Sequence, residues 1–231
     1  MIVKICGITN AQDALAALRA GADWIGLNLV AGPRRIEPTL AGDILSTLED
    51  PKKAVALVRV ERDTVADSLL VTLGKFGGVR LQLYGDVTPV AVASIAQAGF
   101  ETIVVWHVAD NASLGPLDSF LESCQDTPPD YILLDACVPG QLGGTGRRAD
   151  WDAIAREMQK TSDSTRPPLL LAGGLTADNV AQAIARVSPV GVDVSSGVES
   201  SPGKKDSAKV KAFIAAARGA DHPTSAPLHV P

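Results

Sequence analysis

The sequence predicts an α/β fold, a single-domain (β/α)8 TIM barrel in which each of eight parallel strands is followed by a helix. Short apolar runs rich in Val, Ile and Leu alternate with Ala-rich segments along the whole chain, and this alternation is typical of a parallel sheet. The length of 231 residues suits one such barrel. Only 4% of the residues are aromatic, as expected where branched side chains fill the core.

Eight apolar segments are candidate strands, and eight strands of one kind favour a closed barrel over the alternative, a doubly wound open sheet. The segments between them have helical patterns, and several begin at Asn, Asp or Thr, which cap helix N-termini. Gly21 and Gly99 follow two of these helices, where a residue without a β-carbon suits the left-handed C-cap. The strands are expected at residues 2–6, 24–29, 54–60, 79–83, 102–107, 131–134, 169–172 and 191–194. The helices are expected at residues 10–20, 64–75, 88–98, 150–159 and 176–186.

The barrel is expected to occupy residues 1–218 as one domain. Residues 219–231 are rich in proline and poor in apolar side chains, so we expect a disordered C-terminal tail. The segment 135–149 is too rich in glycine for a regular element, and we interpret it as a mobile active-site loop. It contains Pro139, Gly140, Gly143, Gly144 and Gly146.

Composition and charge indicate a small-molecule partner. The net charge of -5 provides no basic surface for nucleic acid or an anionic membrane. Cys6, Cys124 and Cys137 have no CxxC spacing and no nearby His pair, so neither a disulfide framework nor a metal site is expected. The N-terminus lacks the pattern of a signal peptide, and no apolar run approaches the roughly 20 residues of a membrane span, so a cytoplasmic location is expected.

Candidate catalytic residues follow the first and sixth strands, because functional residues of such barrels come from the C-terminal ends of strands. Cys6 shares a strand face with Lys4, whose ammonium would favour a thiolate and make Cys6 a base. The alternative for Cys6 is a small apolar filler of the core. Asp135 ends the apolar run Tyr-Ile-Leu-Leu, where a partly desolvated carboxylate suits a general acid. The alternative for Asp135 is a helix or loop cap.

Two glycine- and serine-rich clusters follow the last two strands and predict a phosphate site, because bare backbone amides and a helix N-terminus can bind an anion. Tight turns are the alternative interpretation. The clusters contain Gly173 and Gly174, then Ser195, Ser196 and Gly197.

Two pairs of adjacent basic residues have different interpretations. Arg34 and Arg35 follow the second strand, where either guanidinium could clamp a carboxylate bidentately or remain solvated. Lys204 and Lys205 are interpreted as a solvated surface pair.

With these residues in place, the chain resembles the phosphoribosylanthranilate isomerase family from end to end. The order and spacing of the motifs carry this resemblance, and the glycine-rich phosphate-binding end is part of it. The motifs are KICGIT at 4–9, LQL at 81–83 followed by Gly85, LLD at 133–135 with GGTG at 143–146, LAGGL at 171–175, and VDVSSGVE at 192–199 followed by PGKKD at 202–206.

The resemblance implies an Amadori rearrangement of N-(5-phosphoribosyl)anthranilate in tryptophan biosynthesis, with Cys6 as general base and Asp135 as general acid. It places an arginine on the anthranilate carboxylate, either Arg34, which is preferred here, or Arg35. Further substrate contacts are implied for Gln82 and Gly144. Neither a metal nor an organic cofactor is implied, and the chain is expected to act as a monomer or homodimer.

The chain departs from the family pattern at Tyr84, where histidine is usual, at Arg59 and Glu61 in the third strand, and in a compact loop around Gly32. Two other functions remain as alternatives. One is the related histidine-pathway isomerase, which has an aspartate where Cys6 stands and needs a second phosphate site. The other is a non-catalytic relative that binds the phosphate substrate without turnover.

Overall fold

The computed structural model describes residues 1–108, 115–135, 151–160 and 166–221. Its eight long strands are parallel and form a closed barrel in chain order, which confirms the predicted (β/α)8 class and excludes the open sheet. The strands are β1 (Ile2–Ile5), β2 (Trp24–Asn28), β3 (Ala54–Val60), β4 (Arg80–Gly85), β5 (Thr102–His107), β6 (Tyr131–Asp135), β7 (Leu169–Ala172) and β8 (Gly191–Val194).

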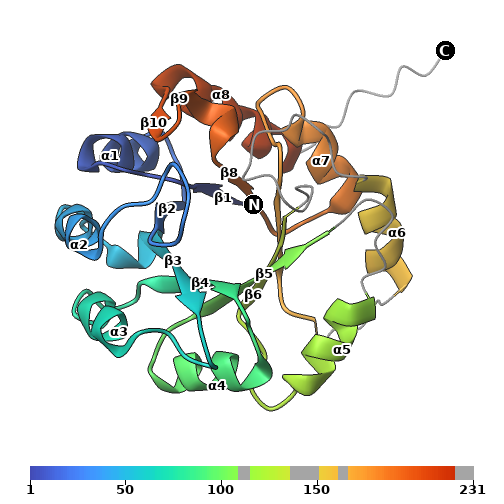
Figure 1. The fold of residues 1–231 in the computed structure, drawn as a ribbon. Helices are drawn as coiled ribbons and strands as arrows, with labels where there is room; N and C mark the ends of the chain where they lie inside the picture. Colours follow the sequence, from blue (N-terminus) through green and yellow to red (C-terminus); the bar gives the residue numbers. More distant parts are fainter. Residues whose placement is uncertain (109–114, 136–150, 161–165, 222–231) are drawn as a thin grey trace.

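Helices surround the barrel on all sides (Figure 1). Asn10 caps the first of them through its side-chain oxygen, which accepts from the Asp13 amide at 2.8 Å, and Thr88 caps the fourth by accepting from the Ala91 amide. The helices are α1 (Ala11–Arg19), α2 (Pro38–Ser46), α3 (Asp67–Gly74), α4 (Pro89–Gln97), α5 (Gly115–Ser123), α6 (Trp151–Lys160), α7 (Val180–Val187) and α8 (Ser207–Asp221).

Three of these helices, α2, α5 and α8, lie outside the segments expected from the sequence. The N-cap residue of α2 is Glu37, which makes no side-chain capping bond, so this helix begins without the usual signal. The expected end of the barrel at residue 218 is too early, because α8 continues through Gly219 and Ala220. Ala220 packs against the core, which offsets the cost of about 1 kcal/mol for a helical glycine. Residues 222–231 of the expected tail lie outside the described residues.

A short insertion separates β8 from α8. It consists of a single-turn helix η2 (Ser196–Val198) and a two-stranded antiparallel hairpin, β9 (Glu199–Ser201) and β10 (Lys204–Lys205). A second short helix, η1 (Pro51–Lys53), precedes β3. Because the hairpin follows η2 directly, it lies next to the cluster Ser195–Gly197.

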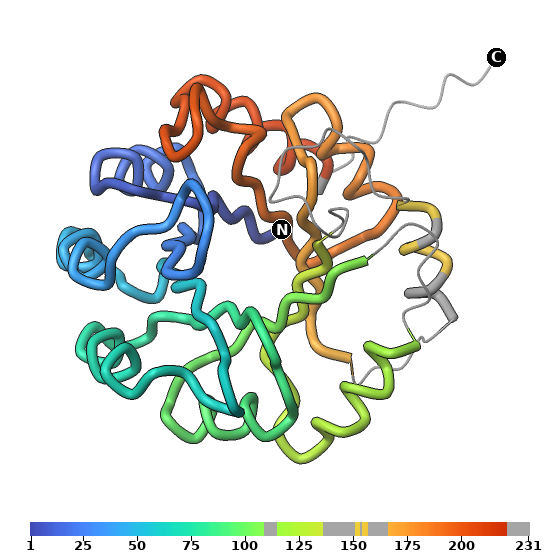
Figure 2. The backbone as a smooth tube through the Cα atoms, in the orientation of Figure 1, coloured from blue at the N-terminus to red at the C-terminus, as the bar shows by residue number. Residues whose placement is uncertain are grey.

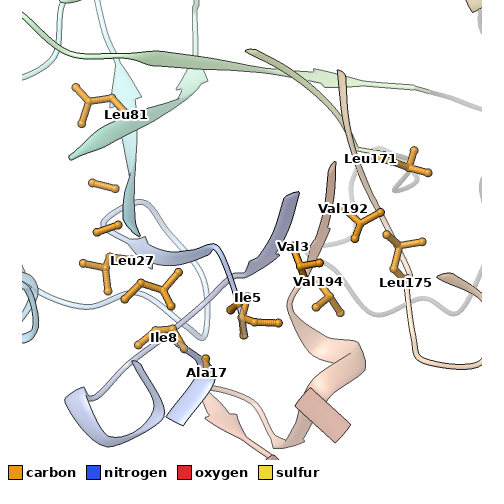
Figure 3. Packing of buried hydrophobic residues seen from close by; sticks show 14 of the residues in the cluster. Val3, Ile5, Ile8, Ala17, Leu27, Leu81, Leu171, Leu175, Val192 and Val194 are labelled. Carbon is orange, nitrogen blue, oxygen red and sulfur yellow. The ribbon is translucent and has the colours of Figure 1, made fainter. Parts of the chain in front are cut away.

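Each strand buries both of its faces, as expected of parallel strands covered by helices. The outward faces form the large core between barrel and helices, with Val3, Ile5 and Val192 among its members (Figure 3). The inward faces form a second cluster inside the barrel. This inner cluster contains Cys6, Trp24, Val55, Leu57, Ile103, Leu133, Leu170 and Ala172.

Aromatic side chains form the floor of the barrel, at the N-terminal ends of β2, β4 and β6. The rings of Trp24 and Tyr131 meet edge to face with centroids 5.1 Å apart. The Arg80 guanidinium lies 4.5 Å from the centroid of the Trp24 ring, which adds a cation–π contact. The interior is therefore packed at this end, and polar groups gather at the other.

The ring closes where β1 pairs with β8, two strands from opposite ends of the chain that lie side by side (Figure 2). In the part of the chain that the structure describes, no helix is long and apolar enough to cross a membrane.

The core predicts a large cost for Phe213→Ala, because Phe213 on α8 is fully buried. We expect the free energy of unfolding to fall by about 3–5 kcal/mol, through lost burial and a cavity. Urea unfolding measures it. Val71→Ala is the control, since Val71 is 63% exposed and its truncation should change stability by less than about 0.5 kcal/mol. Equal effects of the two substitutions would contradict this packing.

Candidate active site

A cavity of about 170 Å³ lies at the C-terminal ends of the barrel strands. It brings together most residues singled out from the sequence: Cys6 just after β1, Asp135 at the end of β6, Arg34 in the loop after β2, and the loops after β7 and β8. Gln82 lies deeper in the barrel, and Gly144 lies outside the described residues. The lining includes Cys6, Asn28, Arg34, Leu57, Tyr84, Asp135, Gly173, Gly174, Asp193, Ser195, Ser196 and Gly197.

Cys6 follows β1 and is buried, with 7% of its surface exposed. Its amide donates to the Val194 carbonyl at 2.8 Å, which fixes the backbone against β8. A β-carbon on Gly26 would lie 2.6 Å from the Cys6 sulfur. The glycine in β2 therefore makes room for the thiol, a requirement that the sequence alone did not reveal.

Two charged side chains lie at the base of this cavity beside Cys6. Lys4 is fully buried, and its Nζ lies 3.0 Å from Oδ2 of Asp193. Burial raises the pKa of the Cys6 thiol; the Lys4 ammonium lowers it and the Asp193 carboxylate raises it, so the pKa lies above its ordinary value. The expected effect of Lys4 is present, but desolvation outweighs it.

Asp193 is a site residue that the sequence reasoning missed. It lies on β8 opposite Lys4 in the register of the two strands. The available signal was a carboxylate inside the apolar strand Gly191–Val194, because a buried carboxylate needs a partner.

Asp135 is the last residue of β6, and its side chain lines the cavity. Its carbonyl accepts from the Val108 amide at 3.0 Å, and its register partners are His107 on β5 and Ala172 on β7. The strand thus holds this carboxylate at the mouth of the barrel, on the opposite side of the ring from β2.

The loop after β7 has the shape that its two glycines allow. Gly173 and Gly174 have φ of 94° and 62°, a region that side chains disfavour. Asn179 holds this loop, since its Oδ1 accepts from the Thr176 amide at 2.8 Å and its Nδ2 donates to the Gly174 carbonyl at 3.0 Å. The sequence reasoning missed Asn179, although an asparagine just before a helix is a signal of a cap or loop anchor.

The cluster after β8 packs closely against this loop. A β-carbon on Gly197 would lie 2.0 Å from the Leu175 carbonyl oxygen, so only glycine fits there. The Ser195 hydroxyl is buried in the cavity wall and has no hydrogen-bond partner among the described residues. A buried hydroxyl of this kind is a ready donor for a ligand.

Arg34 enters the cavity wall through a bidentate ion pair with Glu199. The Nε and Nη2 atoms of Arg34 each donate to a different Glu199 oxygen at 2.7 Å. By contrast, Arg35 is half exposed and pairs with the exposed Glu37. Only Arg34 of the two candidates lines the cavity.

The interpretation of Lys205 as a solvated residue is wrong. Lys205 is 7% exposed, and its Nζ donates to Glu199 at 2.8 Å and to the Ser195 carbonyl at 3.2 Å. The β9–β10 hairpin turns this side chain inward while Lys204 remains exposed. Burial raises the pKa of Glu199, but hydrogen bonds from Arg34 and Lys205 outweigh burial and hold the pKa below its ordinary value.

Gln82 and Tyr84 form a polar pair on β4. Gln82 is buried, and its Nε2 donates to the Tyr84 hydroxyl at 2.9 Å. Burial raises the pKa of Tyr84 well above its ordinary value, so the phenol is neutral. Arg59 and Glu61, in contrast, form an exposed ion pair and do not line the cavity.

The described residues contain no group of three or more His, Cys, Asp or Glu side chains placed to hold a metal ion. A family model described as N-(5'phosphoribosyl)anthranilate (PRA) isomerase matches residues 3–216. The chain belongs to this family.

Individual members of the PRA isomerase family match over nearly their whole length. An N-(5'-phosphoribosyl)anthranilate isomerase from Pelobacter propionicus is 41% identical over 217 residues, covering 94% of this chain and 95% of its own. The crystal structure of the enzyme from Thermotoga maritima superposes with a TM-score of 0.78 at 32% identity, covering 95% of this chain and all of that chain. A phosphoribosyl anthranilate isomerase solved in complex with reduced 1-(o-carboxyphenylamino)-1-deoxyribulose 5-phosphate has a TM-score of 0.74 at 31% identity, with coverage of 95% and 100%.

The ion pairs of Glu199 with Arg34 and Lys205, here called the Glu199 network, predict that the stability of this PRA isomerase family member depends on pH. The pKa of Glu199 in the folded state lies below its ordinary value of 4.5. The ionised Glu199 therefore contributes fully to the free energy of unfolding above about pH 4.5, and this contribution is lost as the pH falls through the folded-state pKa. At neutral pH we expect Glu199→Gln to lower the free energy of unfolding by about 3 kcal/mol, because Arg34 and Lys205 lose their buried partner. Urea unfolding at neutral pH and at about pH 3 should show the difference shrinking in acid.

Glu37→Gln is the matched control, since Glu37 pairs with an arginine on the exposed surface and should cost less than about 1 kcal/mol. A deficit in Glu199→Gln that is the same at both pH values would show that the charge of Glu199 does not carry this contribution.

Proposed function

We propose that this chain catalyses the Amadori rearrangement of N-(5-phosphoribosyl)anthranilate to 1-(2-carboxyphenylamino)-1-deoxyribulose 5-phosphate, a step of tryptophan biosynthesis. The observation that carries the proposal is a single cavity, in a member of this family, that joins a thiol, a carboxylate, an arginine and two glycine-rich loops. Such a set serves a reaction that moves protons on one phosphorylated molecule.

The chemistry divides between Asp135 and Cys6. Asp135 protonates the ring oxygen of the ribose, the C1–O bond breaks, and the nitrogen lone pair forms a C1=N iminium. Cys6 as thiolate then takes the proton from C2, and the electrons of that bond neutralise the iminium to give an enolamine. Protonation at C1 by the Cys6 thiol and loss of the C2 hydroxyl proton to the Asp135 carboxylate yield the ketone and return both groups to their starting states. The iminium acidifies the C2–H bond, so a thiolate suffices as the base.

The placement of the two groups supports this division. Cys6 follows β1 and Asp135 ends β6, so they approach the cavity from different sides of the ring. A sugar held between them would present its ring oxygen to one group and C2 to the other. General acid–base catalysis requires such simultaneous reach.

The loops after β7 and β8 are proposed to hold the 5-phosphate. The left-handed Gly173 and Gly174, the helix α7 behind them and the unsatisfied Ser195 hydroxyl support this assignment. Such a local site explains how a chain with a net charge of -5 would bind an anion.

Arg34 is proposed to meet the anthranilate carboxylate. Its bonds to Glu199 use Nε and Nη2, so a substrate carboxylate would be met by Nη1. We propose that the chain acts as a monomer or a homodimer.

The first test is turnover of freshly generated phosphoribosylanthranilate, followed by its fluorescence. Cys6→Ser and Asp135→Asn are each expected to lower kcat by at least about 100-fold, because each removes one proton-transfer group. Cys124→Ser is the control, because Cys124 is a buried cysteine away from the cavity. Near-normal rates in either site variant would remove that residue from the mechanism. A wild-type chain that binds the substrate without turnover would instead favour the non-catalytic alternative.

The second test separates the two arginines. Arg34→Gln is expected to raise KM by at least about tenfold, through loss of a charge-assisted contact, while Arg35→Gln leaves KM nearly unchanged. Repeating both assays with the aniline analogue, which lacks the carboxylate, distinguishes direct contact from disturbance of the Glu199 network. A defect of equal size with both substrates would overturn the carboxylate assignment.

A further inference from the structure

One buried cation lies between two acids beneath the cavity. Lys4 has no exposed surface, and its ammonium lies 3.0 Å from Asp193 and beside Cys6. Lys4 and Asp193 are strand partners across the β1–β8 seam, and Cys6 is the next inward residue on the same side of β1. The two acids therefore share their nearest positive charge.

Asp193 is able to take up a proton at this place. Its Oδ2 faces Lys4, while its Oδ1 is buried without a hydrogen-bond partner among the described residues. Burial raises the pKa of Asp193, although Lys4 lowers it, and the pKa lies above its ordinary value. A buried carboxylate with one unsatisfied oxygen is stabilised by protonation.

The other charged groups around Cys6 are already committed. Arg34 and Lys205, from the loop after β2 and from β10, both bind Glu199. Tyr84 on β4 is a neutral phenol, and Asp135 on β6 contributes a further carboxylate to the same cavity. Lys4 is thus the cation that Cys6 and Asp193 compete for.

We propose that Asp193 is a positioning residue that shares one proton with Cys6 across Lys4, so that the Cys6 thiolate forms when the proton passes to Asp193. Lys4 gives one proton to Asp193 Oδ2 and receives the thiol proton, so the ammonium is conserved. The S–H bond breaks, an O–H bond forms, and the net charge of the three groups is unchanged. This explains how a thiol in a desolvated site becomes a base without an added counterion. The inference rests on the proposed role of Cys6 as base.

The exchange also fits the proton balance of the proposed reaction. When Cys6 takes the C2 proton, the three groups hold one proton more than at rest. Protonation of the enolamine at C1 consumes one proton, which restores the resting state.

The test uses a chain in which Cys124 and Cys137 are replaced by serine, so that Cys6 is the remaining thiol. The rate of Cys6 alkylation by iodoacetamide is measured against pH by mass spectrometry, because the thiolate alone reacts. Asp193→Asn keeps the shape and removes the competing charge, so we expect the midpoint to move down by about one pH unit or more. Lys4→Met should raise the midpoint. The double variant Lys4→Met/Asp193→Asn leaves no unpaired buried charge, and its midpoint should be higher than that of Asp193→Asn.

Asp135→Asn is the matched control, since it removes a carboxylate from the same cavity but not from beside Lys4. Its shift should be smaller than that of Asp193→Asn. An unchanged or raised midpoint in Asp193→Asn, or equal shifts in the two variants, would overturn the shared proton.

The alkylation assay needs no substrate, so it stands apart from the proposed function. If the chain has no isomerase activity but shows the shift, the proposed function is overturned and the proton sharing stands. If the chain is active but Asp193→Asn does not shift the alkylation midpoint, the proton sharing alone is overturned. In an active chain, the acidic limb of kcat/KM should move with the alkylation midpoint.

Discussion

The pairing of β1 with β8 is the constraint on which the rest of the structure depends. The Ile2 amide donates to Val190 and the Cys6 amide to Val194, each at 2.8 Å, and these bonds join the two ends of the fold. The same seam sets Lys4 opposite Asp193 and puts Cys6 next to the loop that begins at Ser195. The strand pairing that closes the barrel therefore also brings Cys6, the proposed base, together with its charged neighbours.

Glu199 extends this seam into the surrounding loops. Its carboxylate holds Arg34 from the loop after β2 and Lys205 from the hairpin, and Lys205 in turn holds the Ser195 carbonyl. A residue outside the barrel thus fixes the wall between the two proposed anion sites. The stability of the fold and the shape of the cavity are linked through a single side chain.

The sequence predicted those features that one strand or one loop determines by itself. The alternation of apolar runs was enough to predict the barrel. The ends of the strands were enough to predict that Cys6, Asp135, Gly173 and Ser195 lie at one cavity. Asp193 and Gly26 were missed because their importance arises from partners on other strands. Asn179 was missed although its partners lie in its own loop. Lys205 was misassigned because its carboxylate partner, Glu199, becomes its neighbour only when β9 and β10 pair.

The packed floor of Trp24, Tyr131 and Arg80 has a consequence for traffic through the molecule. Because aromatic rings fill the N-terminal end of the barrel, substrate and product pass, as far as the described residues show, through the same opening at the C-terminal end. The ketone product must leave the cavity before the next substrate molecule binds, so product and substrate are expected to compete for the same site. Accumulated product would then inhibit turnover, unless a following reaction consumes it.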